Sequence, residues 1–285
     1  MAYKSLLSIV TSAASADSTI TAASAICLAN DAHLDVLALG VDHTQVGYSY
    51  VGSGAVMLQV ALERAEADAR VQETAVRRAL DAQPAGLRWG VEAAVVQIGA
   101  LTDLVASRAR FSDLVVLARP YGAGVGSEAE AVVEAVLFEA HVPVLVLPAQ
   151  KPGAEDRPST PRRVVIAWNQ SAGALQAVRK AMPFLKAAEM VNIVVIDPPT
   201  HGAERSDPGG MLCQMLVRHG VRAEVSVLAK TMPRVSEVLA RHVRDQNADL
   251  LVMGAYGHSR FREAILGGAT RNMLEQADVP VLMAH

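Results

Sequence analysis

The chain has 285 residues, about twice the length of one typical domain of ~150 residues, so it holds either two domains or one large α/β domain. Hydrophobic residues make up 51% and charged residues 19%, a balance that supplies a large core and excludes a disordered chain. A net charge of −3 with no basic block argues against nucleic-acid partners, and no apolar run reaches the ~18–20 residues that a membrane span needs. Cys27 and Cys213 stand alone, as expected of small core residues in a reducing compartment, and no metal site is expected.

The first residues allow two interpretations. Lys4, the apolar stretch 5–10 and Ala14-Ser15-Ala16 resemble the three parts of an export signal. The apolar stretch is shorter than the usual minimum of ~7 residues, and it also fits as a first strand. We therefore expect a cytoplasmic protein.

Two sequence elements occur twice. Ser112-Asp113-Leu114 and the apolar residues after it match Ala248-Asp249-Leu250, and the Val-Pro-Val run at 142–144 matches 279–281. Between the two copies, residues 150–163 hold three prolines, one glycine and mixed charges, which is typical of a linker. The sequence thus predicts domains at 1–150 and 162–285, joined by a linker at 151–161.

Apolar runs alternate with stretches of helical period in both halves. Strands are expected near 5–10, 34–40, 88–95, 113–118 and 144–148, and again near 164–168, 191–196, 224–228, 250–253 and 279–283. Helices are expected at 57–80, 172–188, 209–219, 233–246 and 269–277. Because such apolar strands are buried on both faces, each half should be a doubly wound parallel α/β sheet, which is Rossmann-like.

The second half carries glycines where ligands bind in such sheets, beyond the carboxyl ends of the strands. Gly254 and Gly257 follow one strand, and Gly267 and Gly268 precede the last helix, with Ala269 and Thr270 in its first turn. Glycines there let backbone N–H groups approach an anion, and the helix dipole favours negative charge. An ordinary strand-to-loop turn is the alternative explanation of this spacing.

With this spacing the chain resembles the universal stress protein family (UspA-like), in its tandem form, over 3–149 and 162–285. Its nucleotide-binding members carry G-x2-G-x9-G-[S/T], which Gly254, Gly257 and Gly267 match, with Gly268 in the last place. The resemblance implies the strand order 3-2-1-4-5 in each half and two halves packed as a pseudo-dimer through their terminal strands. It implies ATP, with or without Mg²⁺, as the cofactor. The nucleotide would be held by residues that correspond to Asn169, Val195, Met253, Gly254, Gly257, Gly267, Gly268, Ala269 and Thr270.

Two departures would weaken such binding. Asn169 stands where the family often has an aspartate, and Gly268 lacks a hydroxyl that would contribute ~0.5–1.5 kcal/mol, which Thr270 could replace. His258, Ser259 and Arg260 either reach phosphate oxygens or remain solvated. Trp168 either stacks on a base or packs in the core.

The first half departs further, since Ala118 to Tyr121 replace the first glycines and Glu130 and Ala131 replace the second pair. A carboxylate near a phosphate opposes binding by up to roughly 4 kcal/mol, so we expect no ATP in this half. His219 and His242 lie on charged helices and are expected at the surface.

The sequence lacks the P-loop, the nucleophile elbow and the H-E-x-x-H motif, and it shows no general base near the glycines. The favoured hypothesis is a stress-response module that binds an adenine nucleotide in its C-terminal half and is not a dedicated enzyme. The alternatives are a nucleotide-free module that binds a protein partner, and a weak ATPase. Each of these three hypotheses is compatible with a homodimer.

Overall fold

The computed structural model describes residues 2–44, 54–122, 125–149, 160–198, 206–255 and 268–285. It divides into two compact units, which we call the N-terminal unit (Tyr3–Val142) and the C-terminal unit (Ala2 with Pro143–His285). This division falls just before the Val-Leu-Val strand that ends the first half, and residues 151–159 of the expected linker lie outside the described ranges.

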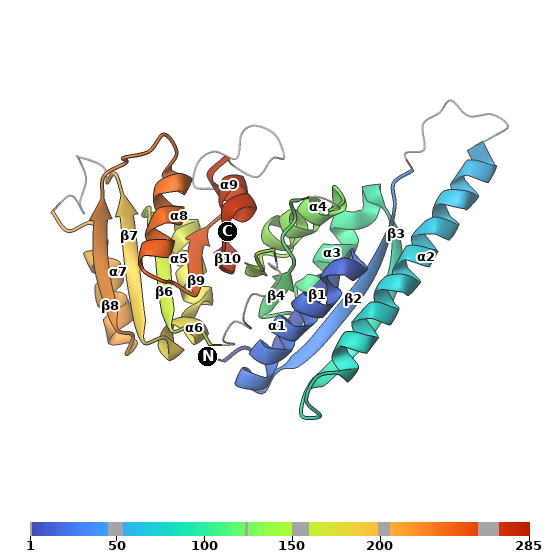
Figure 1. Cartoon of the computed structure of the whole chain (residues 1–285), viewed down its shortest axis with the longest axis horizontal. Coiled ribbons are helices and arrows are strands. Elements are labelled where there is room, and N and C mark those ends of the chain that lie inside the picture. The colour runs from blue at the N-terminus through green and yellow to red at the C-terminus, as the bar shows by residue number, and fades with distance from the viewer. Residues whose placement is uncertain (1, 45–53, 123–124, 150–159, 199–205, 256–267) are drawn as a thin grey trace. The chain divides into compact units, whose positions relative to one another are not determined.

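The N-terminal unit is an α/β sheet with the parallel strand order β3-β2-β1-β4 (Figure 1). Its strands are β1 (Ser5–Val10), β2 (His33–Asp42), β3 (Arg88–Gln97) and β4 (Leu114–Leu117). Its helices are α1 (Ala16–Asn30), α2 (Gly54–Asp81), α3 (Leu101–Ala109) and α4 (Glu128–Glu134), with short 3-10 turns at Ala13–Ser15 and Ile98–Ala100 and a π-helical turn at Ala135–Glu139. The residues weighed as an export signal thus include an inner strand, β1.

The C-terminal unit repeats the scheme and has the order β8-β7-β6-β9-β10-β5. Its strands are β5 (Val144–Val146), β6 (Arg163–Ala167), β7 (Met190–Ile196), β8 (Ala223–Leu228), β9 (Leu250–Gly254) and β10 (Val281–Ala284). Its helices are α5 (Ala172–Lys180), α6 (Met182–Ala187), α7 (Gly210–Arg218), α8 (Val235–Asp245) and α9 (Gly268–Gln276). The order of β6 to β10 is the expected 3-2-1-4-5.

The terminal strands of the two halves pair with each other. β5 and β10 run antiparallel, with Leu145 opposite Leu282, whereas every other strand pair described in either unit is parallel. Both strands are fully buried. Two short apolar strands that would each be an exposed sheet edge cover one another in this way, as the sequence predicted.

The repeated aspartate has a structural reason. Asp113 Oδ2 accepts hydrogen bonds from the backbone N–H groups of Lys4 (2.7 Å) and Ser5 (3.1 Å), where β1 begins. Asp249 Oδ2 accepts the same pair of bonds from Arg162 (2.8 Å) and Arg163 (2.9 Å), where β6 begins. In each half, the residue before the fourth strand therefore fixes the start of the first strand.

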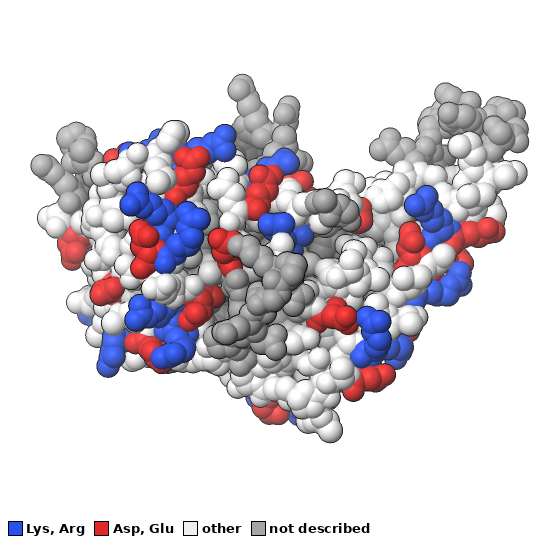
Figure 2. Space-filling view, in the orientation of Figure 1, with Lys and Arg blue, Asp and Glu red and all other residues white. Residues whose placement is uncertain are grey.

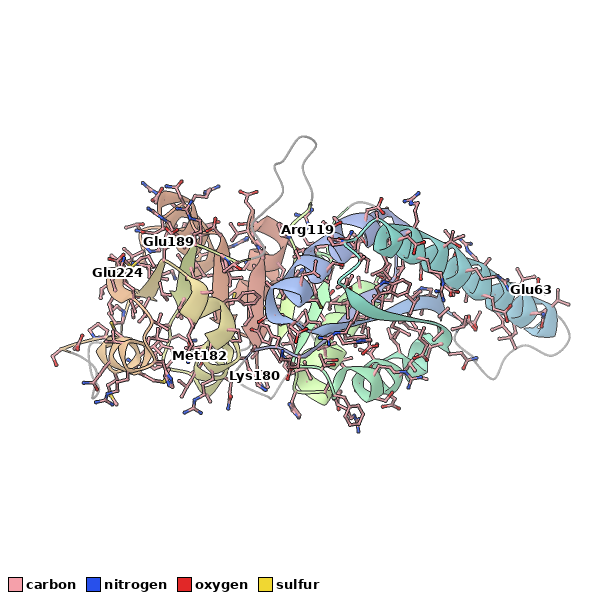
Figure 3. All side chains as sticks on the ribbon, turned by 90° about the horizontal axis from the view of Figure 1, so that it is seen from below. Glu63, Arg119, Lys180, Met182, Glu189 and Glu224 are labelled. Atoms are coloured by element: carbon pink, nitrogen blue, oxygen red, sulfur yellow. The ribbon has the colours of Figure 1, made fainter. Side chains whose placement is uncertain are left out.

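Three expectations about these elements are wrong. The strands β3 and β8, which stand at the outer ends of the strand order, are not buried on both faces, since both contain exposed residues. The helix expected over 172–188 is two helices, and the break falls at Ala181, just before Pro183 in the first turn of α6. Figure 3 shows Glu224 on the outer strand β8.

His242 is the third correction, because it is only 7% exposed and not a surface residue. Its Nε2 lies 2.8 Å from Asn192 Oδ1, and the Asn192 amide donates to Glu224 (2.9 Å) and Ser226 (2.8 Å). The polar neighbours that satisfy the imidazole lie on β7 and β8, far from α8 in the sequence, so the charged pattern of α8 could not reveal them. His219, by contrast, is exposed.

This burial predicts a pH dependence of stability. Burial lowers the pKa of His242, against the weaker opposing effects of Asp245 and Glu224. The folded state therefore binds a proton less readily than the unfolded state, whose histidine titrates near about pH 6.5. The free energy of unfolding that neutral His242 supports is fully present above that pH and is lost as the pH falls towards the lower folded value.

Urea denaturation at about pH 8 and about pH 5.5 checks this prediction. The loss of stability on acidification should be smaller in His242→Gln than in the wild type, whereas the exposed control His219→Gln should behave as the wild type does. Identical pH dependence in all three proteins would contradict it.

Candidate functional site

The expected nucleotide site lies at the carboxyl edge of β6 and β9. These strands are parallel neighbours with Ala167 opposite Met253, so Asn169 and Gly254 emerge at the same edge of the sheet. The last helix, α9, begins at Gly268. Gly257, Gly267, His258, Ser259 and Arg260 lie outside the described residues.

Asn169 is exposed at this edge, but its carbonyl oxygen is already in use. Oδ1 accepts from the backbone N–H of Ser171 (3.2 Å) and from the Ser171 hydroxyl (2.7 Å). The Ser171 Oγ in turn accepts from Ala174 N at 3.1 Å and caps the start of α5. The group that Asn169 has left for a ligand is thus its Nδ2 donor, whereas an aspartate there would offer only acceptors.

Gly254 has a packing reason of its own. A Cβ atom at this position would lie 2.5 Å from Ala174 N and 2.8 Å from the carbonyl carbon of Gly173, both in the backbone at the start of α5. Only glycine permits this close approach of β9 and α5. The packing of β9 against α5 therefore explains this glycine without a ligand. The lack of a side chain also leaves the backbone at the end of β9 uncovered.

The remaining expected residues divide by exposure. Gly268 and Ala269 are exposed, and no described atom lies within 4 Å of a Cβ built on Gly268. Thr270 is 3% exposed, so little of this residue faces solvent. Val195 and Met253 are buried side chains, so only their backbone could face a ligand.

Trp168 is also buried, with 9% of its surface exposed, which favours packing over stacking on a base. Its indole Nε1 is shielded from solvent and has no hydrogen-bond partner among the described residues. A buried donor without a partner is uncommon and lowers stability.

At the corresponding edge of the N-terminal unit, several side chains pair with one another. The Tyr121 hydroxyl donates to Glu130 Oε1 (2.7 Å), and Arg119 Nε donates to the Tyr121 carbonyl (3.0 Å). Glu128 and Glu130 both stand in the first turn of α4. These carboxylates place negative charge at the helix end where the dipole would otherwise favour an anion.

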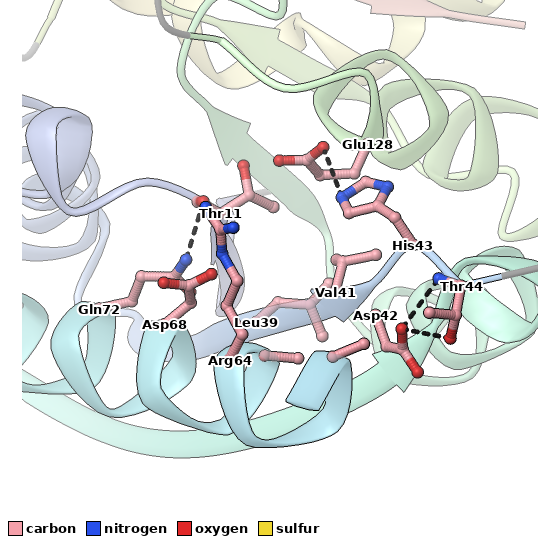
Figure 4. Close-up of a pocket in the computed structure, with 12 residues that line it drawn as sticks. Thr11, Leu39, Val41, Asp42, His43, Thr44, Arg64, Asp68, Gln72 and Glu128 are labelled. Carbon is pink, nitrogen blue, oxygen red and sulfur yellow. Dashed lines mark hydrogen bonds and ion pairs between the residues drawn. The ribbon is translucent and has the colours of Figure 1, made fainter. Parts of the chain in front are cut away.

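The N-terminal unit contains a cavity of about 520 Å³ that was not predicted from the sequence (Figure 4). It lies beyond the ends of β1 and β2, against α2. Its lining residues are Thr11, Leu39, Val41, Asp42, His43, Thr44, Ala61, Arg64, Ala65, Asp68, Gln72 and Glu128. Arg64, Asp68 and Gln72 recur every four residues on one face of α2, a spacing that could have been noticed in the sequence.

Other kinds of site find no support within the described residues. They contain no group of three or more His, Cys, Asp and Glu side chains that could hold a metal ion. Within the same ranges, no helix combines the length and apolarity needed to cross a membrane. Burial raises the pKa of the Cys27 thiol to about 12, which makes it an inert core residue. Figure 2 shows basic and acidic side chains intermingled on the face in view.

Comparisons with known proteins agree with this fold. Residues 160–285 match the Universal stress protein family. A universal stress protein from Synechocystis sp. (strain PCC 6803) is 30% identical over 145 residues, which cover 49% of this chain and 46% of the relative. The chain thus spans about half the length of this curated relative.

Two crystal structures cover nearly the whole chain. A universal stress protein from Archaeoglobus fulgidus DSM 4304 is similar over 100% of this chain and 96% of its own, with a TM-score of 0.67 and 16% identity. A functionally unknown protein from Pseudomonas aeruginosa PAO1 is similar over 99% and 92%, with a TM-score of 0.55 and 14% identity. At these identities the two structures establish the fold alone. Over residues 160–285, the chain is therefore similar to the universal stress protein family.

Proposed function

We propose that the C-terminal unit binds ATP or a related adenine nucleotide and acts as a stress-response module rather than as a dedicated enzyme. The observation that carries the proposal is the convergence of Asn169 and Gly254 at the ends of neighbouring strands, in a sheet whose last helix opens on exposed Gly268. Open parallel sheets bind ligands at such an edge, where strand order reverses.

Polar groups at this edge that have no partner among the described residues also support the proposal. Asn169 Nδ2 and the buried Trp168 Nε1 are donors, and the first turn of α9 presents backbone N–H groups. Donors without carboxylates in the same turn favour an anionic ligand. The N-terminal unit has the opposite arrangement, with glutamates in the first turn of α4.

Calorimetric titration of the full chain with ATP, with and without Mg²⁺, tests the proposal. The wild type should bind, and Gly257→Glu should bind at least about tenfold more weakly because a carboxylate near a phosphate is repelled. Gly99→Glu is the matched control, since Gly99 lies in the N-terminal unit and no described atom lies within 4 Å of a Cβ added there.

Gly268→Ser should bind roughly two- to tenfold more tightly because it adds a hydroxyl donor.

Equal heats from the wild type and Gly257→Glu would reject this site. Adenine nucleotide in the supernatant of heat-denatured, freshly purified protein would be independent support. If the protein is instead a weak ATPase, it should release phosphate above the blank rate, and Gly257→Glu should remove that activity.

A nucleotide-free interaction module is the second candidate function. The observation in its favour is a row of exposed apolar side chains near the start of α2, where Val56, Met57 and Val60 are 68%, 63% and 59% exposed. Large exposed apolar residues gathered on one helix are typical of contact surfaces. Protein that purifies without nucleotide and shows no heat with ATP would favour this function.

A further inference from the structure

The cavity of the N-terminal unit holds charged groups of two kinds: groups with partners and groups without. Asp42 Oδ1 accepts from the Thr44 backbone N–H (2.9 Å) and hydroxyl (2.6 Å), and these bonds lower the pKa of Asp42. His43 Nε2 lies 3.5 Å from Glu128 Oε2. Figure 4 shows both pairs at one side of the cavity. These groups are satisfied by the protein itself.

Arg64 and Asp68 are the groups that have no partner in the part of the chain that the structure describes. Both side chains are exposed and line the cavity, and neither side chain makes a hydrogen bond or ion pair with another residue in the described ranges. They lie one helical turn apart on α2, so a cationic donor and an anionic acceptor stand next to each other without pairing (Figure 4).

Gln72, one further turn along α2, adds a neutral acceptor. Its Nε2 donates to the Thr11 carbonyl at 2.8 Å, which fixes the amide against the end of β1. The residue is 6% exposed, and its Oε1 has no hydrogen-bond partner among the described residues. A buried acceptor without a partner is unfavourable, and a donor supplied at the cavity wall would relieve it.

We propose that this cavity binds a small zwitterion of the α-amino-acid class, with its carboxylate on Arg64 and its ammonium group on Asp68 and the Gln72 carbonyl. The complementarity is specific: a guanidinium binds a carboxylate through two N–H donors, and an ammonium group has three donors for the two acceptors that follow on α2. A volume of about 520 Å³ is ample for an amino acid with bound water.

The charges in the cavity disfavour a phosphate in the same place. Asp42, Asp68 and Glu128 contribute three carboxylates against the single guanidinium of Arg64 and the imidazole of His43. A ligand that brings one positive and one negative charge leaves this balance unchanged, whereas a di- or triphosphate adds negative charge only. The ligand proposed here is thus different in kind from the nucleotide of the C-terminal unit.

Calorimetric titration of the full chain with each of the twenty L-amino acids, up to roughly 10 mM, tests the proposal. At least one amino acid should bind. Its amide, which lacks the carboxylate, and its deaminated acid, which lacks the ammonium group, should each bind at least about tenfold more weakly. Arg64→Gln and Asp68→Asn should weaken binding to a similar degree.

Arg70→Gln is the matched control, because Arg70 lies on the same helix and pairs only with Glu66 at 3.7 Å among the described residues. It should bind as the wild type does, and circular dichroism should show that all three variants keep the fold. The proposal is overturned if no amino acid binds, if Arg64→Gln or Asp68→Asn binds unchanged, or if the amide binds as well as the amino acid. It is equally overturned if adenosine or ATP binds and competes at Arg64.

Discussion

Gly254→Ala should lower the free energy of unfolding by about 1–3 kcal/mol, because its Cβ would collide with fixed backbone atoms of α5. The reduced freedom of the unfolded chain offsets only about 0.4–1 kcal/mol of this loss. Urea denaturation of the wild type and the variant measures the difference.

Gly268→Ala is the matched control, since both glycines belong to the same sequence pattern and the second has open space around its Cβ among the described residues. Its stability should stay within about 0.5 kcal/mol of the wild type. If both variants are equally stable, the close approach of β9 and α5 is not the reason for Gly254.

Asp249→Ala should be the other strongly destabilising change, by about 2–3 kcal/mol, because it removes two charge-assisted hydrogen bonds at the start of β6. The freed N–H groups of Arg162 and Arg163 would then depend on water. Asp249→Asn keeps an acceptor and should recover part of the loss, as urea denaturation of both variants would show.

Asp245→Ala provides the comparison for Asp249. Asp245 is an exposed carboxylate four residues away that pairs with Arg241 at 3.6 Å on the surface of α8. Exposed pairs of this kind contribute roughly 0.3–0.5 kcal/mol, so the variant should be close to the wild type. Similar losses from Asp245→Ala and Asp249→Ala would show that the backbone bonds are not what the repeated aspartate supplies.

The strands were the most predictable elements. Runs such as Leu114 to Leu117 carry their own signal, because a strand covered on both faces is apolar along its whole length. The edge strands β3 and β8 and the break between α5 and α6 were less predictable, since they depend on which neighbours cover each residue.

The places of the glycines in the fold could be predicted from the sequence, but the chemistry around them could not. The glycine spacing placed Gly254 and Gly268 correctly at a strand end and a helix start. It could not show that Ser171 already uses the carbonyl oxygen of Asn169, that Thr270 is buried, or that Trp168 leaves an indole N–H without a partner among the described residues. These properties arise from contacts between residues that are far apart in the sequence, or from hydrogen bonds within a local turn.

By itself, the sequence determined the duplication of the α/β scheme and the apolar terminal strands that pair, because apolar periodicity and repetition are local properties of a chain, whereas the strand order of the second half was implied by the family resemblance. The tertiary structure alone decided that His242 is buried against Asn192, that Gly254 is required by α5, and that Arg64, Asp68 and Gln72 line a cavity. The reason is that burial and hydrogen-bond satisfaction depend on which atoms of other elements lie opposite a side chain, and that information exists only once the elements have packed.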